Sequence, residues 1–217
     1  MRQRKVKNIE ERMQTVKQYF LKDAKQLKGS WKSLFQNERN LFLELGCGKG
    51  NFILKQAQLH PENNYIGIEG QLSVVFRALQ KLEDTTLSNV RFACEFVNRP
   101  EDFFANDELS GIYLNFSDPW DKSRHAHRRL THRNYLRQYH QIIKPGGFLE
   151  IKTDNDSLFL FTDDEVREAA SDWFCVEIIT ADLHRTGFEA KNVTTEYEDK
   201  FKEAGKNIHY IKLISLK

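Results

Sequence analysis

The sequence predicts an α/β protein with a doubly wound, mostly parallel β-sheet. Strand-like apolar runs alternate with helix-like segments along most of the chain, a pattern typical of parallel sheets covered by helices. The run Leu41–Leu45 passes directly into a glycine-rich turn, and polar or acidic residues follow four of the runs. Ligands of this fold class bind at the carboxyl ends of the strands, so these polar ends predict a binding site.

The chain begins with a basic segment. Residues 2–32 hold ten Lys and Arg against three acids. We expect residues 1–36 to form a basic N-terminal arm and a helix over Glu10–Leu27, which Gly29-Ser30-Trp31 ends. Residues 37–217 are expected to form the main domain, because 40% of the 217 residues are hydrophobic and 12% aromatic, enough for a globular core.

Seven apolar segments are predicted as strands, at Leu41–Leu45, Tyr65–Glu69, Val90–Cys94, Gly111–Phe116, Phe148–Thr153, Phe174–Ile179 and Ile208–Leu216. Helices are predicted at Gly50–Leu59, Leu72–Leu82, Thr131–Ile143 and Ser157–Asp172. Thr131 is expected to cap its helix, and Lys144-Pro145-Gly146-Gly147 to end it. The last two strands have no clear helix between them and are expected to pair antiparallel, so that the last strand runs against the others.

A second basic block lies in the middle of the chain. The formal net charge is only +2, yet residues 122–144 contain seven Lys and Arg and four His with no acid. Two such blocks on a nearly neutral chain indicate a face that binds a polyanion. The alternative for either block is an ordinary solvated surface.

The remaining composition argues against several other classes of protein. The three cysteines, Cys47, Cys94 and Cys175, lack metal-ligand spacing, and the histidines are not spaced with acids as zinc ligands are, so no metal site is expected. No signal peptide begins the chain and no apolar stretch approaches membrane length. These observations predict a reduced, cytoplasmic protein without a membrane partner.

The glycine-rich turn favours a particular cofactor. Three alternating glycines follow the first strand, at Gly46, Gly48 and Gly50. The dinucleotide pattern G-x-G-x-x-G would need glycine at the position of Asn51. The observed G-x-G-x-G, with Glu44 two residues before it, is the pattern of S-adenosylmethionine methyltransferases, because a carboxylate attracts the cofactor's ammonium and sulfonium charges. The alternative is a glycine-rich turn that binds no ligand.

Two other strand ends extend this site. Glu69 lies 19 residues beyond Gly50, where doubly wound folds place a carboxylate that accepts hydrogen bonds from ribose. Asp118 and Trp120 follow the fourth strand and precede the second basic block, which suggests chemistry on a nucleobase with Trp120 as a stacking surface. The alternative for Trp120 is a core or hinge aromatic.

Several motifs together resemble one family over essentially the whole chain. They are ELGCGKG at 44–50, YIGIE at 65–69, YLNFSDPW at 113–120, RHxxRRL at 124–130, IKTDN at 151–155, DLH at 182–184 and TEYEDKF at 195–201. The chain resembles the bacterial tRNA (guanine-N7-)-methyltransferases, which methylate a guanine at position 46 in the tRNA variable loop. The resemblance implies a seven-stranded class I, Rossmann-like methyltransferase domain, with S-adenosylmethionine as cofactor, S-adenosylhomocysteine as product, and a monomer or homodimer acting on tRNA.

The resemblance also implies roles for individual residues. Asp118 would be catalytic and contact the cofactor. The other cofactor-binding residues would be Glu44, Gly46, Gly48, Gly50, Glu69, Glu95 and Phe96. The substrate-binding residues would be Lys122, Asp154, Thr195, Glu196, Tyr197 and Glu198. The RNA-binding residues would be Arg124, His125, His127, Arg128 and Arg129.

Three positions depart from the family pattern. Phe96 stands where the family has an aspartate near the adenine, so Glu95 or Asn98 would take that contact. Asp121 replaces a proline, and His127 replaces a lysine or arginine. Two other functions therefore remain open at this point: a methyltransferase acting on another RNA or a small molecule, and an RNA-binding protein whose cofactor site has decayed.

Overall fold

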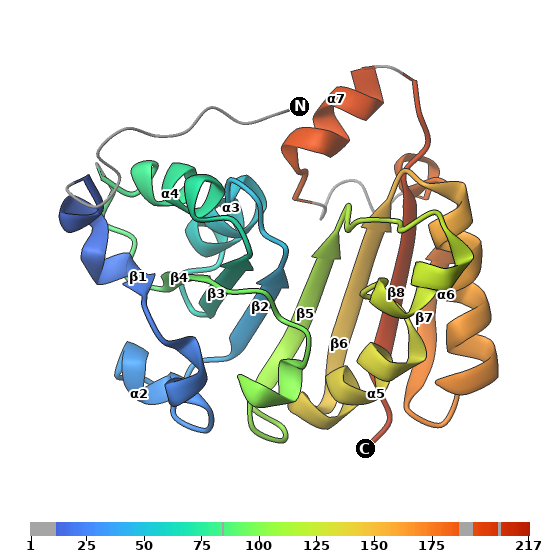
Figure 1. Cartoon of the computed structure of the whole chain (residues 1–217), viewed down its shortest axis with the longest axis horizontal. Coiled ribbons are helices and arrows are strands. Elements are labelled where there is room, and N and C mark those ends of the chain that lie inside the picture. The colour runs from blue at the N-terminus through green and yellow to red at the C-terminus, as the bar shows by residue number, and fades with distance from the viewer. Residues whose placement is uncertain (1–11, 84, 187–192, 204) are drawn as a thin grey trace.

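The protein is a three-layer α/β structure around one eight-stranded sheet (Figure 1). The computed structural model describes residues 12–83, 85–186, 193–203 and 205–217. The strands are β1 (Phe20–Leu21), β2 (Leu41–Leu45), β3 (Asn64–Glu69), β4 (Val90–Cys94), β5 (Leu109–Asn115), β6 (Ile143–Thr153), β7 (Phe174–Thr180) and β8 (His209–Ser215). The helices are α2 (Trp31–Phe35), α3 (Asn51–Leu59), α4 (Leu72–Gln80), α5 (Arg133–Ile142), α6 (Asp156–Ala169) and α7 (Glu196–Glu203).

The strand order is β1-β4-β3-β2-β5-β6-β8-β7. All neighbouring pairs are parallel except β6–β8 and β7–β8, which are antiparallel. The predicted doubly wound sheet with an antiparallel last strand is therefore confirmed. The sheet has one strand more than the predicted seven, because the short strand β1 pairs with the outer edge of β4.

The alternation of side chains along β2 builds two cores. Leu41, Leu43 and Leu45 face one layer, which includes α5 and α6, and are at most 5% exposed. Phe42 faces the other layer, formed by α3 and α4. Because successive side chains of a strand point to opposite faces, a run whose five side chains are all buried, as in β2, belongs to a strand that is covered on both sides.

The N-terminal segment differs from the prediction. A single helix over Glu10–Leu27 is wrong for the described part of that range: 3₁₀ helices at Met13–Tyr19 and Ala24–Leu27 flank β1. The extended residues Phe20 and Leu21 pair with the edge of β4, which satisfies backbone groups that the edge strand would otherwise leave open. Residues 1–8 of the predicted arm lie outside the described residues.

Trp31 attaches the following segment to the sheet layer. Its side chain is fully buried, its ring stacks on Phe104 at a centroid distance of 5.1 Å, and its Nε1–H donates to the Phe103 carbonyl at 2.9 Å. A buried indole needs such an acceptor, so this contact fixes α2 against the core. No helix within the described ranges is long and apolar enough to cross a membrane.

Two boundaries near α5 were also predicted incorrectly. The N-cap is His132, whose side chain accepts the Asn134 amide, whereas the Thr131 hydroxyl is buried and accepts a hydrogen bond from Thr162 at 2.8 Å. The helix ends at Ile142, and β6 begins at once, so that the stretch expected to be a loop after the helix belongs to the strand. Pairing of Ile143 with Leu109 explains this early start.

Candidate functional site

The glycine turn after β2 forms one side of the site. Gly46, Gly48 and Gly50 all adopt left-handed backbone angles, with φ of 77°, 55° and 73°. A Cβ at Gly46 or Gly48 would meet no atom within 4 Å, so the main chain there is open to a ligand. A Cβ at Gly50 would instead collide with Ala78 and Phe92, so this glycine is needed for packing against α4 and β4.

Glu44, at the end of β2, is a buried carboxyl with one unused acceptor. Its side chain is 3% exposed and accepts a hydrogen bond from Asn115 Nδ2 at 2.9 Å. The second oxygen, Oε2, has no hydrogen-bond partner among the described residues. Burial raises the pKa of Glu44 to about 8, and the hydrogen bond from Asn115 only partly offsets that rise. A cationic group of a ligand would satisfy this oxygen and favour its ionised form.

Glu69, at the end of β3, closes the same turn from the neighbouring strand. Its carboxylate accepts the Gly48 amide at 3.2 Å and the Gln71 amide at 3.1 Å. The glycine turn and Glu69 therefore form one unit, as the motif spacing predicts. The open glycines and the unpaired Glu44 oxygen fit the ammonium end of S-adenosylmethionine, and Glu69 stays the residue expected to accept from its ribose.

Phe96 lies beside this unit, after β4. Its ring is 75% exposed and rests on Gly70, where it leaves no room for a Cβ. Glu95 is half-buried, and its amide donates to the Glu69 carbonyl at 3.1 Å. The departure from the family pattern at position 96 therefore places an aromatic face, and not a carboxylate, at the outer edge of the site.

The loop after β5 forms a second pocket, of about 350 Å³. It is lined by Asp118, Pro119, Trp120, Asp121, Lys122 and His125. Because β5 lies next to β2 in the sheet, this pocket and the glycine turn share the carboxyl edge. Asp118 is exposed here, with a carboxylate free to accept from a ligand.

Two left-handed residues shape this loop. Phe116 and Trp120 have φ of 53° and 45°, which is strained for residues with large side chains. The Phe116 amide donates to the Lys152 carbonyl at 2.8 Å, and the Trp120 ring meets the edge of His125. The guanidinium of Arg128 lies 5.0 Å from the centre of the Trp120 ring, so a base that stacks on Trp120 needs the opposite face or displaces Arg128.

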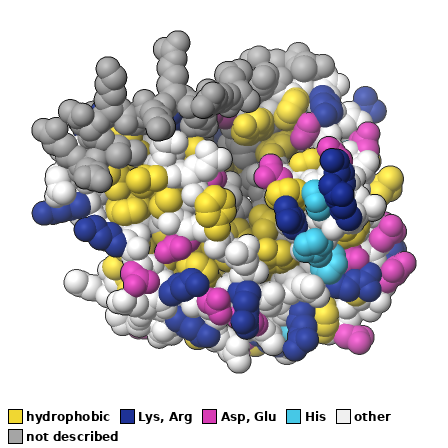
Figure 2. All heavy atoms as spheres, in the orientation of Figure 1, with side chains coloured by type: hydrophobic (Ala, Val, Ile, Leu, Met, Phe, Trp, Pro, Cys, Tyr) yellow, Lys and Arg dark blue, Asp and Glu magenta, His cyan; other side chains and the backbone are white. Residues whose placement is uncertain are grey.

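The members of the predicted RNA-binding segment differ in exposure. Arg124, His127 and Arg128 are exposed, and His125 is half-buried. Figure 2 shows blue and cyan side chains gathered on the right of the molecule, where Figure 1 draws the segment after β5. Arg129 is only 8% exposed, and its guanidinium donates to the carbonyls of Pro119 at 2.8 Å and Trp120 at 3.3 Å. These hydrogen bonds stabilise the loop after β5 from its buried side.

Helix α7 brings the TEYE residues to the same edge, over the carboxyl ends of β5 and β6 (Figure 1). The absence of a helix between the late strands was predicted incorrectly. Thr195 accepts the Glu198 amide at 3.0 Å, and the pattern Thr-x-x-Glu before a helix is a known N-terminal signal that would have identified it. Tyr197 is 62% exposed and stacks on Phe116 at 6.0 Å.

Glu196 and Glu198, both in the first turn of α7, have different surroundings. Glu198 is fully buried and pairs with the buried Lys152 at 2.9 Å, so it anchors the helix to β6. Burial lowers the pKa of Lys152, and the charge of Glu198 acts in the opposite direction. Glu196 reaches the glycine turn and α3, where it contacts Lys49 and Asn51.

The last predicted substrate residue is Asp154, which follows β6. Its carboxylate is paired with Lys206 at 2.6 Å and is 23% exposed. Lys122 is exposed and lines the Asp118 pocket. The structure therefore gathers all the predicted cofactor and substrate residues along one edge of the sheet, with Glu198 and Arg129 behind it.

Comparisons with known proteins identify the family of this chain. A family model described as putative methyltransferase matches residues 38–211. The chain is 42% identical to a tRNA (guanine-N(7)-)-methyltransferase of Oceanobacillus iheyensis over 212 residues, covering 98% of both chains. It is also 42% identical to the Brevibacillus brevis enzyme of the same name over 184 residues, covering 85% of both.

Solved structures show the same fold at low identity. A 16S rRNA (adenine(1408)-N(1))-methyltransferase from Catenulisporales acidiphilia, with its cosubstrate, superposes with a TM-score of 0.59 at 13% identity, covering 87% of this chain and 91% of that one. The antibiotic-resistance methyltransferase Kmr gives 0.56 at 17% identity, covering 82% and 87%. With both the matched family model and the near full-length relatives, the chain belongs to the tRNA (guanine-N(7)-)-methyltransferase family.

Proposed function

We propose that the protein transfers a methyl group from S-adenosylmethionine to N7 of a guanine in tRNA, at position 46 of the variable loop. The observation that carries this proposal is the shared edge of the sheet, where the open glycine turn with Glu44 adjoins the Asp118 pocket and the exposed basic segment. The names of the relatives support tRNA and guanine N7, and the position within tRNA rests on the family resemblance.

The chemistry needs positioning more than proton transfer. Guanine N7 has an in-plane lone pair and no proton, so no strong general base is required. The cofactor supplies a methyl group already activated by its sulfonium charge. The protein contributes binding sites that hold the methyl group of the cofactor and guanine N7 in a fixed relative position. Correct placement of reactants alone accelerates such a step by many orders of magnitude.

Asp118 is assigned the role of stabilising positive charge on the guanine. Methylation at N7 leaves the purine ring positively charged, so a carboxylate close to the base is favourable along the reaction path. We assign this carboxylate to Asp118, which also accepts hydrogen bonds from N1–H and the amino group of guanine, alone or together with Asp154. The other substrate contacts assigned are Lys122, Thr195, Glu196 and Tyr197, with Glu198 acting behind them on α7.

The test is incubation with labelled S-adenosylmethionine and unmodified tRNA, followed by mapping of 7-methylguanosine. We expect the label at guanine 46 of the variable loop. Label at another nucleotide, or no label in a protein that binds tRNA, contradicts the proposal. Calorimetric titration with S-adenosylhomocysteine distinguishes the remaining alternative, because an RNA-binding protein with a decayed cofactor site would give no binding.

A further inference from the structure

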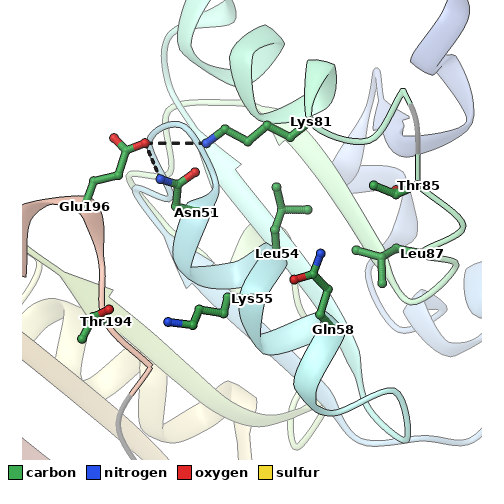
Figure 3. Close-up of a pocket in the computed structure, with 9 residues that line it drawn as sticks. All are labelled: Asn51, Leu54, Lys55, Gln58, Lys81, Thr85, Leu87, Thr194 and Glu196. Carbon is green, nitrogen blue, oxygen red and sulfur yellow. Dashed lines mark hydrogen bonds and ion pairs between the residues drawn. The ribbon is translucent and has the colours of Figure 1, made fainter. Parts of the chain in front are cut away.

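A cavity of about 400 Å³ lies on the side of α3, at some remove from the Asp118 pocket. It is formed where α3, the end of α4 and the start of α7 meet (Figure 3). Its lining is mainly polar and cationic: the side chains of Asn51, Lys55, Gln58 and Lys81 face it, and Glu196 is the one acid among the lining residues. Of the residues given roles so far, only Glu196, assigned above as a substrate contact, lines this cavity.

The acid in the cavity sits among converging donors. The Glu196 carboxylate lies 3.1 Å from Lys49 Nζ and 3.7 Å from Lys81 Nζ, and Asn51 Nδ2 donates to it. Burial raises the pKa of Glu196, but the hydrogen bond and charge of Lys49, the charge of Lys81 and the Asn51 hydrogen bond together bring it below its usual value. Three donors, from the glycine turn, the start of α3 and the end of α4, thus converge on one anionic group.

The cations exceed what Glu196 can neutralise. Lys55 follows Asn51 by one helical turn on α3, so both side chains share one face. Among the residues that the structure describes, no ion pair or hydrogen bond engages the Lys55 ammonium. Lys49 and Lys81 pair with the Glu196 carboxylate, and Lys55 lines the same cavity without contacting it, so the charged residues around the cavity carry an excess of positive charge.

We propose that this cavity takes a phosphate of the tRNA backbone, and that Glu196 fills the phosphate position in the free protein. Lysine and amide donors at the start of a helix are the groups that bind phosphate. The α7 turn that carries Glu196 also carries Tyr197, which stacks on Phe116 two residues before Asp118. The first turn of α7 thus links the two places, because Tyr197 lies against the loop of Asp118 and Glu196 lines the cavity. We place the RNA backbone along this turn when its guanine occupies the Asp118 pocket, so that Glu196 contributes to substrate binding by leaving the phosphate position and not by direct contact. The inference rests on the proposed function.

The test measures tRNA affinity without turnover. Lys55→Gln is the principal variant, because Lys81 also donates to the Lys49 carbonyl at 2.8 Å and so supports the glycine turn. Filter binding of unmodified tRNA to S-adenosylhomocysteine-loaded protein is followed over a range of salt concentrations. Lys55→Gln should weaken binding about threefold to tenfold and reduce the slope of log affinity against log salt by about 0.7 to 1.

The matched control is Arg39→Gln, an exposed residue outside both basic blocks that lies just before the start of β2, at the opposite edge of the sheet, and it should leave affinity and slope unchanged. Glu196→Gln, which removes the competing charge at constant size, should tighten tRNA binding. S-adenosylhomocysteine affinity should stay at the wild-type value in Lys55→Gln. An unchanged slope in Lys55→Gln, or weaker tRNA binding by Glu196→Gln, overturns the proposal.

Two further outcomes separate this inference from others. Titration of AMP into the loaded protein should show no saturable binding; saturable binding that Lys55→Gln abolishes would assign the cavity to a free nucleotide and overturn its assignment to RNA. If the wild-type protein forms 7-methylguanosine normally and Lys55→Gln keeps the wild-type salt slope, only the phosphate site is refuted. Absence of 7-methylguanosine with wild-type protein refutes the proposed function itself.

Discussion

Glu44 is a carboxyl whose surroundings shift its pKa from the ordinary 4.5 to about 8. Near neutral pH the empty site therefore holds mostly the protonated form. An ammonium group beside Oε2 favours the carboxylate and lowers that pKa, so cofactor binding at neutral pH should release a proton from Glu44. This coupling between cofactor binding and proton release arises because the Glu44 carboxyl is buried with no charged group of the described residues in contact. The sequence motif does not reveal that environment.

The first prediction concerns the pH dependence of cofactor binding. Because the ionised form of Glu44 binds best, S-adenosylhomocysteine affinity should rise by up to about tenfold per pH unit between about pH 6 and 8 and level off above. Calorimetry in two buffers of different ionisation enthalpy measures the affinity and the released proton. Equal affinity at pH 6 and 8 in the wild type would contradict the role of Glu44.

Glu44→Gln is the matched variant, with the same size and no charge. Its affinity should be lower and should lack the pH dependence below pH 8. Its stability gives an independent check: since the folded-state pKa of Glu44 is raised, ionisation destabilises the empty protein increasingly as pH rises from about 4.5 toward 8. Thermal unfolding should therefore show Glu44→Gln stabilised relative to wild type at pH 8.5 and little changed at pH 4.5.

The second prediction concerns Asp118. Asp118→Asn and Asp118→Ala should reduce methyl transfer by about a hundredfold or more, because the carboxylate that opposes the purine charge is lost. Single-turnover formation of 7-methylguanosine with saturating tRNA measures this step. Both variants should unfold at the wild-type temperature, since Asp118 is exposed. A folded Asp118→Ala protein with normal turnover would leave Asp118 as a turn residue only.

At the scale of elements, Arg129 holds the loop that carries Asp118. Its guanidinium bonds two successive carbonyls and lies 4.3 Å from the centre of the Phe161 ring. One of these carbonyls belongs to Trp120, whose left-handed backbone needs such support. The family resemblance implies RNA contact for Arg129, and the structure shows a buried side chain that donates to the loop, so we propose that it positions the loop instead.

The third prediction compares the two adjacent arginines. Arg129→Met keeps the apolar stem but removes the donors, and should lower kcat about tenfold or more while the KM for tRNA changes little. Arg128→Gln, on the exposed neighbour, should raise the KM for tRNA and leave kcat nearly unchanged. Tryptophan emission should shift in Arg129→Met as Trp120 becomes more exposed. A rise in KM alone for Arg129→Met would instead assign it to RNA binding.

The buried pair Lys152–Glu198 fixes a second element, helix α7. Both side chains are at most 2% exposed, and Lys152 Nζ also donates to the Val193 carbonyl at 2.9 Å. Removing one partner of such a pair leaves a buried charge without its counter-ion. Replacing both partners by apolar groups avoids that cost.

The fourth prediction is a double-mutant cycle on this pair. Lys152→Met and Glu198→Leu should each lower the free energy of unfolding by about 3–5 kcal/mol, and the double variant should lose clearly less than the sum. Urea unfolding measures all four proteins. Additive losses would show that the two charges do not stabilise each other and that α7 is held by its other contacts.

Elements with a strong local pattern could be predicted from the sequence. The bounds of β2 and β4 agree with the prediction, because each is a mainly apolar run that follows an asparagine and ends at a glycine turn or at an acid. Phe20–Leu21 could not be identified as a strand, because only the exposed edge of β4 makes those two residues extended. The helix α7 was missed although Thr195 and Glu198 gave a signal, because its charged sequence has no continuous apolar face.

At the scale of the whole molecule, the sheet order brings distant motifs together. The glycine turn and the loop after β5 are adjacent because β2 and β5 are central neighbours, although about 70 residues separate them. Strand-end chemistry thus allowed the candidate site to be predicted. The sequence could not show which charged side chains face a ligand and which stabilise the protein. Arg128 and Arg129 look alike in sequence and differ only in burial.

The last prediction concerns the basic segment at the N-terminus, which lies outside the described residues. Arg2, Arg4, Lys5 and Lys7 are concentrated in eight residues. If they contact phosphates, deletion of residues 1–8 should weaken tRNA binding and reduce the salt slope, by up to about 0.7–0.9 per lost contact, and leave S-adenosylhomocysteine affinity unchanged. The measurement is filter binding over a range of salt concentrations.

A charge-neutral variant of the same segment, with these four residues changed to Gln, is its matched control. It should reproduce the deletion, because phosphate contacts depend on charge and not on chain length. Combined with Lys55→Gln, the losses in salt slope should add, since the two sets of cations would hold separate phosphates. Wild-type affinity after deletion would show that the segment is only a solvated tail, and the polyanion face would then consist of the block at 122–144.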